Sequence, residues 1–246
     1  GEFWEGLPGP GGGAYTELLE ALPRRVVRRR CGRGTHLDAG PVSLDILHPP
    51  RAADNAGPVP GENENSLVIR LTMGQASFLL MGDAGPETER ALLESGADLQ
   101  SAVLKAGHHG SALSTSAEFL AAVRPRLVLD SAGEGNTYGF PSPRFLARCR
   151  DAGAEVFRTD LDGAIEIRTD GQKLAVRTAA SRRAKEDPDF RLTRTTKSMI
   201  IAVDSRSAIA MGKTKLLAAF FLPLLLVSFL QSQSLAELAK KEKERR

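Results

Sequence analysis

Apolar positions in the first 178 residues fall into short runs with the length and spacing of β-strands. Residues 42–46 alternate apolar and polar positions, as in a half-buried strand, and Pro49-Pro50 ends the run. Two further runs flank Gly74-Gln75 and predict a hairpin. The expected strands are residues 42–46, 67–71, 78–81, 102–104, 127–129, 155–158 and 164–168.

Helical patterns occupy the intervals between these runs. The clearest is bracketed by Pro86 at a helix start and Gly96 after its end, and another has Ser142 as N-cap with Pro143 at the first helical position. The expected helices are residues 16–22, 87–95, 116–123 and one from Pro143 to near Gly153. Strands interleaved with helices predict an α/β or α+β layered fold.

The charge distribution divides the chain near residue 178. The net charge of +3 is the sum of −4 over residues 1–178 and +7 over residues 179–246. The body therefore has no overall charge that attracts polyanions, and nucleic-acid binding there needs a local basic patch. The basic run Arg24–Arg30 predicts either a solvated strand or a phosphate-binding surface. Two cysteines, Cys31 and Cys149, form no metal-ligand spacing.

The last 68 residues have a different character. Residues 179–210 are polar and weakly patterned, which predicts a linker. Residues 211–246 contain a charged start, the apolar run Leu216–Leu230 and a polar end, as in a secretory signal or a membrane anchor. The run is shorter than the ~20 residues of a spanning helix. We consider a fused, unrelated reading frame, a membrane anchor and a buried helix as explanations.

The chemistry-bearing residues follow the predicted strands. His108-His109-Gly110-Ser111 comes directly after residues 102–104 and contains two of only four histidines. Such a strand end can present metal ligands or acid/base groups. Asp83 follows residues 78–81 and could bridge cations or cap the next helix. Lys105 is one of two lysines in an Arg-rich body, and its ammonium could act beside a phosphate or be structural.

Four motifs, in order, resemble a known family. They are Asn-Glu-Asn-Ser-Leu-Val at 63–68, Leu-Met-Gly-Asp-Ala at 80–84, Val-Leu-Lys-Ala-Gly-His-His-Gly-Ser at 103–111 and Asn-x-Tyr-Gly-x-Pro at 136–141. Over residues 1–178 the chain resembles the C-terminal metallo-β-lactamase-fold domain of ComEC-type competence proteins. These are membrane proteins that carry single-stranded DNA inward during transformation. The resemblance implies a four-layer αβ/βα sandwich with metals at one edge between two sheets, and hydrolysis of phosphodiester bonds by a metal-activated water.

The resemblance also assigns roles to residues. Asp83 is expected to be a bridging metal ligand, and His108 and His109 to supply one ligand and one supporting or proton-transfer group, in an order that the sequence leaves open. Lys105, Asn65 and Ser66 are expected to contact the phosphate or to position the ligands. The implied cofactor is a divalent metal, Zn or Mn. The implied partners are DNA and, through the parent protein or residues 216–230, the cytoplasmic membrane.

Two departures from the family pattern limit the expected activity. The family's His-x-Asp-x-Asp-His motif has no counterpart here, so the chain looks like the C-terminal part of the domain and is expected to bind metal weakly and to be inactive alone. Phe140 replaces the histidine of Tyr-Gly-His-Pro and cannot ligate or transfer a proton. The alternatives are a non-catalytic nucleic-acid-binding or structural module and a hydrolase of the same fold acting on a small molecule.

Overall fold

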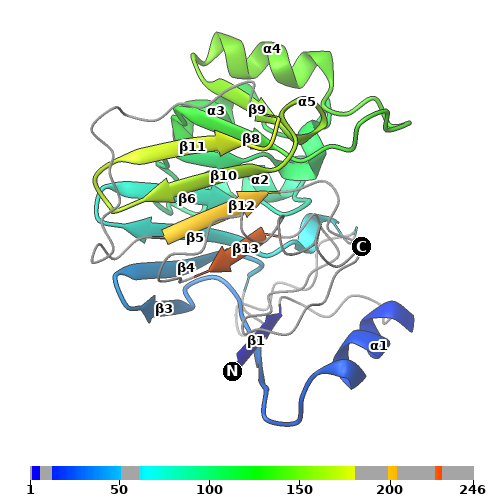
Figure 1. The fold of residues 1–246 in the computed structure, drawn as a ribbon, viewed down its shortest axis with the longest axis vertical. Coiled ribbons are helices and arrows are strands. Elements are labelled where there is room, and N and C mark those ends of the chain that lie inside the picture. The colour runs from blue at the N-terminus through cyan, green and yellow to red at the C-terminus, as the bar shows by residue number, and fades with distance from the viewer. Residues whose placement is uncertain are drawn as a thin grey trace.

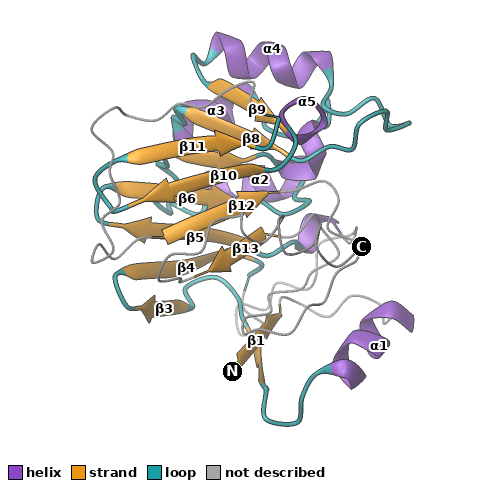
Figure 2. Ribbon diagram, in the orientation of Figure 1, coloured by secondary structure: helices purple, strands orange, loops and turns teal. Residues whose placement is uncertain are grey.

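The computed structural model describes residues 2–5, 13–50, 61, 63–180, 199–203 and 225–228. The described strands form a sheet of seven, a sheet of four and a separate parallel pair. Figure 1 shows the four-stranded sheet in front of the seven-stranded sheet, with helices behind the larger one. Figure 2 shows the same layers by element type.

The seven-stranded sheet has the order β3-β4-β5-β6-β7-β8-β9. Its members are β3 (His36–Ala39), β4 (Val42–His48), β5 (Val68–Met73), β6 (Ala76–Leu80), β7 (Val103–Lys105), β8 (Leu127–Asp130) and β9 (Glu155–Arg158). Pairing is antiparallel from β3 to β6 and parallel from β6 to β9. The change follows from the connections, because parallel neighbours need a crossover. Three helices supply it: α2 (Pro86–Glu94), α3 (Ala117–Val123) and α4 (Pro143–Asp151).

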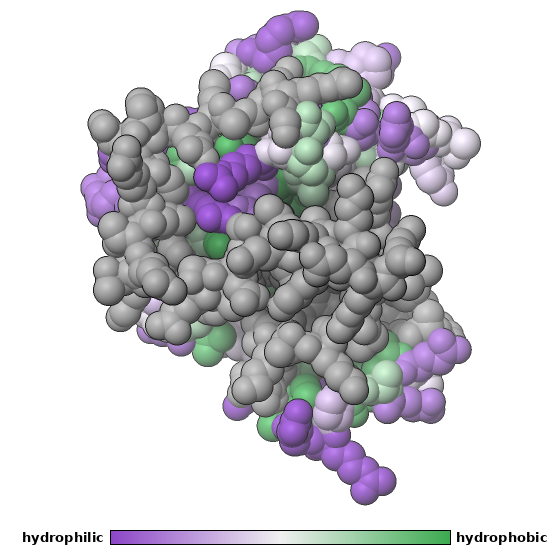
Figure 3. All heavy atoms as spheres, viewed as in Figure 1, coloured by the Kyte–Doolittle hydropathy of each residue, from purple (hydrophilic) through white to green (hydrophobic). Residues whose placement is uncertain are grey.

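The second sheet has the order β11-β10-β12-β13. Its strands are β10 (Ile165–Thr169), β11 (Leu174–Thr178), β12 (Met199–Val203) and β13 (Leu225–Ser228). Ile165, Ile167 and Val176 are buried between the two sheets, together with Phe78 and Leu129 of the larger sheet. Hydrophilic residues gather over β10 and β11 on the face shown in Figure 3. Apolar residues on one side of this sheet and hydrophilic residues on the other are typical of a sheet with one face in the core.

A second apolar cluster lies between the large sheet and its helices. It includes Leu104 and Val128 from the strands, and Leu92, Phe119 and Phe145 from α2, α3 and α4. The described layers are therefore helix, sheet and sheet. The α/β class predicted from the sequence is confirmed, and three of the expected four layers are formed by the described residues.

The N-terminal strands form the separate pair. β1 (Glu2–Glu5) pairs in parallel with β2 (Val27–Arg30), and α1 (Gly13–Ala21) lies between them in sequence. All four residues of β2 are exposed. Arg28 Nη2 donates to Glu5 Oε1 and Oε2 at 3.0 and 3.1 Å. The structure confirms a solvated strand at the basic run, and a phosphate-binding surface on this strand stays a prediction.

Two described segments depart from the predicted domain plan. Met199–Val203 lies inside the expected linker, yet it forms β12 and pairs with β10. The prediction averaged a polar region and overlooked five consecutive apolar residues that can fill the sheet face. Leu225–Ser228 lies inside the expected signal-like segment and pairs with β12 as β13, so these four residues are not helical. The rest of residues 179–246, apart from Ala179 and Ala180, lies outside the described residues.

Candidate functional site

The predicted chemistry-bearing residues meet at one edge of the large sheet. Leu80, Lys105 and Leu129 are neighbours across β6, β7 and β8. Asp83 follows β6, the histidine pair follows β7, and Asp130 ends β8. Because these strands are parallel, their carboxyl ends lie at the same edge, where α/β proteins place ligands.

His109 faces Asp83 across this edge. His109 Nε2 lies 3.2 Å from Asp83 Oδ1. His109 Nδ1 lies 2.5 Å from the Ser131 carbonyl oxygen, so Nδ1 carries the proton and donates it there. The Nε2 lone pair then points toward a carboxylate oxygen that is buried and has no hydrogen-bond donor among the described residues. Two acceptors held this close favour a cation between them.

The electrostatics keep the His109 lone pair available. Burial lowers the pKa of His109, and the positive charge of Lys105 lowers it further, while Asp83 acts in the opposite direction. A neutral imidazole is the form that binds a metal. Only 27% of the His109 side chain and 20% of the Asp83 side chain are exposed, so water screens the pair incompletely.

The structure excludes the second interpretation of Asp83, a helix cap. The N-cap of α2 is Gly85, and no side chain at that position caps the helix. Glu64, which lies before β5 in the sequence, does so, since its Oε2 accepts from the Thr88 backbone N–H and from Thr88 Oγ1, both at 2.8 Å. A Cβ on Gly85 would lie 2.2 Å from Glu64 Oε1. Because Glu64 caps α2, Asp83 is not needed as a cap and is available to the site.

Ser66 and Asn65 each stabilise a different loop through one hydrogen bond. Ser66 Oγ accepts from the Asp83 backbone N–H at 3.1 Å, directly beside the left-handed turn at Gly82. Asn65 Nδ2 donates to the Gly61 carbonyl oxygen at 2.8 Å. Ser66 thus holds the segment that carries the carboxylate, whereas Asn65 closes its own loop.

The two histidines have different surroundings. Both adopt left-handed backbone conformations, with φ of 46° at His108 and 52° at His109. Such a conformation costs roughly 1–2 kcal/mol per non-glycine residue and is typical of functional sites. The His108 ring packs edge-on against Phe140 at 5.8 Å between centroids. The structure therefore places the His109 ring against the Asp83 carboxylate and the His108 ring against Phe140.

Two charged side chains hold the loop that follows the histidines. Both oxygens of the buried Glu89 carboxylate accept from backbone N–H groups, Oε1 from Thr115 and Oε2 from Ser116 at 2.9 Å. Arg148 of α4 donates to three carbonyl oxygens of the same loop, residues 112, 114 and 115, at 3.1, 2.6 and 2.8 Å. The loop is fixed to α2 and α4, and this fixes the histidines that precede it.

Lys105 and Asp130 are buried charges behind the histidines. Lys105 is 5% exposed, and its Nζ donates to the Ala106 carbonyl oxygen at 2.6 Å. Burial lowers the pKa of Lys105, and the negative charges of Asp130 and Asp83 oppose this. Burial also raises the pKa of Asp130 to about 6, and neither of its oxygens has a partner in the described part of the chain.

Sequence reasoning missed Glu64, Glu89, Arg148 and Asp130. The sequence did contain a signal for Asp130, because this residue comes directly after an apolar strand run. Asp83 lies in nearly the same position after its own run. A weaker signal existed for Glu64, since a helix that starts with Pro86 and has no capping side chain before it needs an acceptor from elsewhere. Glu89 and Arg148 act on a distant loop, so nothing local in the sequence indicates their roles.

The donor set fits part of a metal site. Asp83 Oδ1 and His109 Nε2 are two suitable ligand atoms, but the described residues contain no group of three or more histidine, cysteine, aspartate and glutamate side chains that could hold a metal. A catalytic zinc usually has three protein ligands.

Comparisons with known proteins agree on one group of relatives. No family model matches the chain. It is 34% identical to the ComE operon protein 3 of Bacillus subtilis over 151 residues, 61% of this chain and 19% of that protein. It is 40% identical to the competence protein ComA of Neisseria gonorrhoeae over 107 residues, 43% of this chain and 16% of that protein. The recombination protein 2 of Haemophilus influenzae is 31% identical over 151 residues, 61% of this chain and 18% of that protein.

One solved structure, a mutant of the CmlA beta-hydroxylase, gives a TM-score of 0.37 at 16% identity and covers 61% of this chain and 35% of its own. Among the described helices, none has the length and apolarity to cross a membrane. The chain spans about a fifth of the length of these curated relatives, and over the matched residues it is similar to these ComEC-family proteins.

Proposed function

We propose that this chain is part of a metal-dependent phosphodiesterase that acts on DNA during its uptake. The observation that carries the proposal is the pair formed by Asp83 Oδ1 and His109 Nε2, 3.2 Å apart, with the His109 tautomer fixed by the Ser131 carbonyl. The competence relatives support a role in DNA uptake. By the same resemblance, we place the protein at the cytoplasmic membrane with DNA as its partner.

In this proposal Asp83 and His109 hold a divalent ion, Zn or Mn. Such an ion supplies an activated water and neutralises charge on the scissile phosphate. Ser66 positions Asp83 through the backbone N–H, and Ser131 orients His109. His108, whose ring packs against Phe140, is the group left to contact the substrate or to move a proton.

The chain alone is expected to bind metal weakly and to hydrolyse little. Two ligand atoms are present among the described residues, and the family motif His-x-Asp-x-Asp-His has no counterpart in the sequence. A two-ligand site loses much of the affinity that three ligands give.

Calorimetric titration with Zn²⁺ and Mn²⁺ tests the site directly. Asp83→Asn and His109→Gln should each abolish the weak binding, because each removes one of two ligand atoms. His36→Gln is the matched control, since His36 is an exposed histidine on β3 paired with Asp38 and Asp45. Binding that survives both site variants would refute the proposal.

Hydrolysis is measured in parallel on labelled single-stranded DNA. We expect little cleavage by this chain. Robust cleavage that a chelator abolishes would overturn the expected inactivity but support the reaction class. Cleavage that a chelator leaves unchanged would contradict the metal-dependent mechanism.

A non-catalytic DNA-binding or structural module is the second candidate. Phe140 favours it, because an aromatic ring packs against His108 where the family has a histidine. Phe140→His discriminates the two: a gain in metal affinity would favour the hydrolase, and no gain would favour the module.

A further inference from the structure

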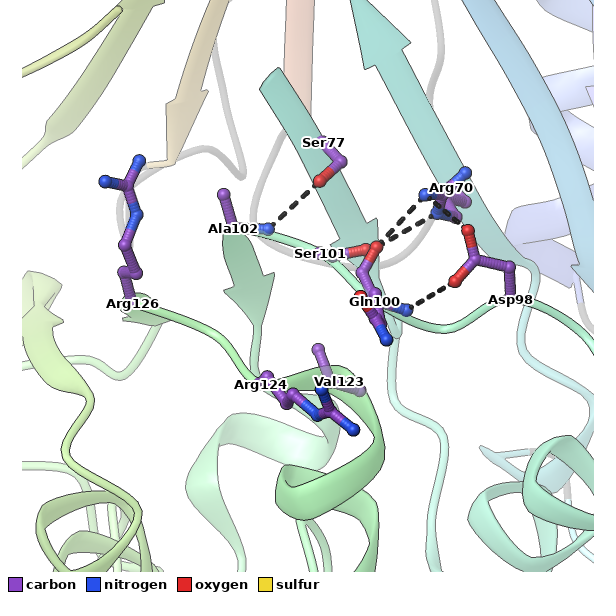
Figure 4. Close-up of a pocket in the computed structure, with 9 residues that line it drawn as sticks. All are labelled: Arg70, Ser77, Asp98, Gln100, Ser101, Ala102, Val123, Arg124 and Arg126. Atoms are coloured by element: carbon purple, nitrogen blue, oxygen red, sulfur yellow. Dashed lines mark hydrogen bonds and ion pairs between the residues drawn. The ribbon is translucent and has the colours of Figure 1, made fainter. Parts of the chain in front are cut away.

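A cleft of about 340 Å³ lies at the opposite end of the parallel strands from the histidine site. It is formed where β5 and β6 meet the segments that lead into β7 and β8 (Figure 4). Its lining residues are Arg70, Ser77, Asp98, Gln100, Ser101, Ala102, Val123, Arg124 and Arg126. Ser101 precedes β7 and Lys105 ends it, so about 13 Å of extended chain, at ~3.3 Å per residue, separates these two residues, and the histidine pair follows Lys105.

Positive charge dominates this cleft. Three arginines line it against one carboxylate, and that carboxylate is already engaged, since Asp98 Oδ2 lies 3.0 Å from Arg70 Nη2. Arg124 and Arg126 are exposed, and no described carboxylate lies within 4 Å of either guanidinium. The Arg124 side chain makes one long hydrogen bond, 3.4 Å from Nε to the Ala121 carbonyl oxygen. Two guanidinium groups are therefore available for an anion.

A buried hydroxyl also lines the cleft. Ser101 is 3% exposed, and its Oγ has no hydrogen-bond partner among the described residues. Leaving a buried polar group unpaired costs roughly 1–3 kcal/mol. A bound oxyanion would accept from this hydroxyl, so the orphaned group is a second indication of a ligand, independent of the charge.

The backbone around the cleft is held in place. The Ser101 backbone N–H donates to the Val123 carbonyl oxygen at 3.0 Å, and that of Arg126 donates to the Ala102 carbonyl oxygen at 3.0 Å. Arg70 donates through Nε and Nη2 to the Gln100 carbonyl oxygen. The cleft is thus a fixed feature of the strand ends, and the arginines project from an ordered frame.

We propose that this cleft binds backbone phosphates of single-stranded DNA, as a second contact for the strand presented to the histidine site. The inference rests on the proposed function. Guanidinium groups match phosphate oxygens in geometry and charge. The body carries a net charge of −4, so a polyanion must be held by a local basic patch such as this one. The central strand β7 is only three residues long, so a few nucleotides can reach from one end of it to the other.

Fluorescence anisotropy of a labelled oligothymidylate, with EDTA present throughout, measures this contact without hydrolysis. The test variant is Arg124→Gln/Arg126→Gln. The matched control is Arg90→Gln/Arg150→Gln, which removes the same charge from exposed arginines that pair with Glu87 and Asp151 on α2 and α4.

Log affinity falls as log salt concentration rises, and each phosphate contact on a single strand contributes about 0.7 to the steepness of this fall. The test variant loses two such contacts, so its slope should be shallower by about 1.4. If the variant and the unchanged protein bind equally at 1 M salt, this difference in slope makes the variant bind roughly 25-fold more weakly at 0.1 M salt. The control should change the slope by much less.

The inference is overturned if the two double variants behave alike, or if the chain does not bind the oligonucleotide. Binding that depends on Arg124 and Arg126, in a chain whose metal affinity is unaffected by Asp83→Asn and His109→Gln, would support the cleft while refuting the proposed function. If metal binding requires Asp83 and His109 but the arginine variants do not change the affinity for DNA, the proposed function is supported and the DNA-binding role of the cleft is refuted.

Discussion

Replacing Arg148 should loosen the loop that positions the histidine pair. Its guanidinium group donates to three carbonyl oxygens of residues 112–115, at distances from 2.6 to 3.1 Å. A net contribution of about 1 kcal/mol per hydrogen bond gives about 3 kcal/mol for Arg148→Met. With a urea dependence of about 2–3 kcal/mol per molar, the unfolding midpoint should fall by about 1 M.

Arg144→Met is the matched control. Arg144 lies one turn earlier on α4, is exposed and has the same charge, so its loss should change the free energy of unfolding by no more than about 0.5 kcal/mol. Urea unfolding followed by circular dichroism measures both variants. If Arg148→Met destabilises the protein by less than about 1 kcal/mol more than the control, the three hydrogen bonds do not stabilise the loop and the reasoning is refuted.

Three other changes test the packing and charges around the site. Gly107→Ala places a Cβ 2.5 Å from the Ala84 carbonyl oxygen and should destabilise by about 1–3 kcal/mol in thermal unfolding, whereas Gly133→Ala, with open space around it, should not. Burial raises the pKa of Asp130 from 3.8 to about 6, so the native state binds more protons between these values and the free energy of unfolding falls as pH rises through them. Asp130→Asn should remove roughly 3 kcal/mol of that fall, measured as the free energy of urea unfolding across a pH series. If the pH dependence of the free energy of unfolding is unchanged in this variant, burial does not raise the pKa of Asp130 as argued. Burial also raises the pKa of the Cys149 thiol to about 12, so iodoacetamide at pH 8 should alkylate it only after denaturation.

Most strands that coincide with apolar runs could be predicted from the sequence, whereas a strand without such a run could not. The runs 67–71 and 78–81 became β5 and β6, paired as the expected hairpin. His36–Ala39 has no apolar run, and its residues alternate between exposed and half-buried, yet it pairs with β4 as β3. β12 has an apolar run but was missed, because the region around it is polar on average and its partner β10 is some thirty residues away.

Site residues that follow strands could be predicted, since the topology alone carries them to one edge. Asp83 and the histidine pair are of this kind. Which histidine faces Asp83 could not be predicted, because it depends on two left-handed residues and on the Ser131 carbonyl. Asp130 also ends a strand, but a lone aspartate after an apolar run has no second feature in the sequence to single it out.

The surroundings of Lys105 bear on the two roles that the resemblance implies for it. A lysine in an Arg-rich body fits a site with a single acceptor, the Ala106 carbonyl oxygen, because an arginine would bury five donors there. At 5% exposure its ammonium lies beneath the surface, where it interacts electrostatically with Asp83 and Asp130. A positive charge so placed offsets part of the electrostatic repulsion between the two carboxylates. Its burial and its charge interactions favour an effect of Lys105 on the carboxylates through its charge over direct contact with a phosphate.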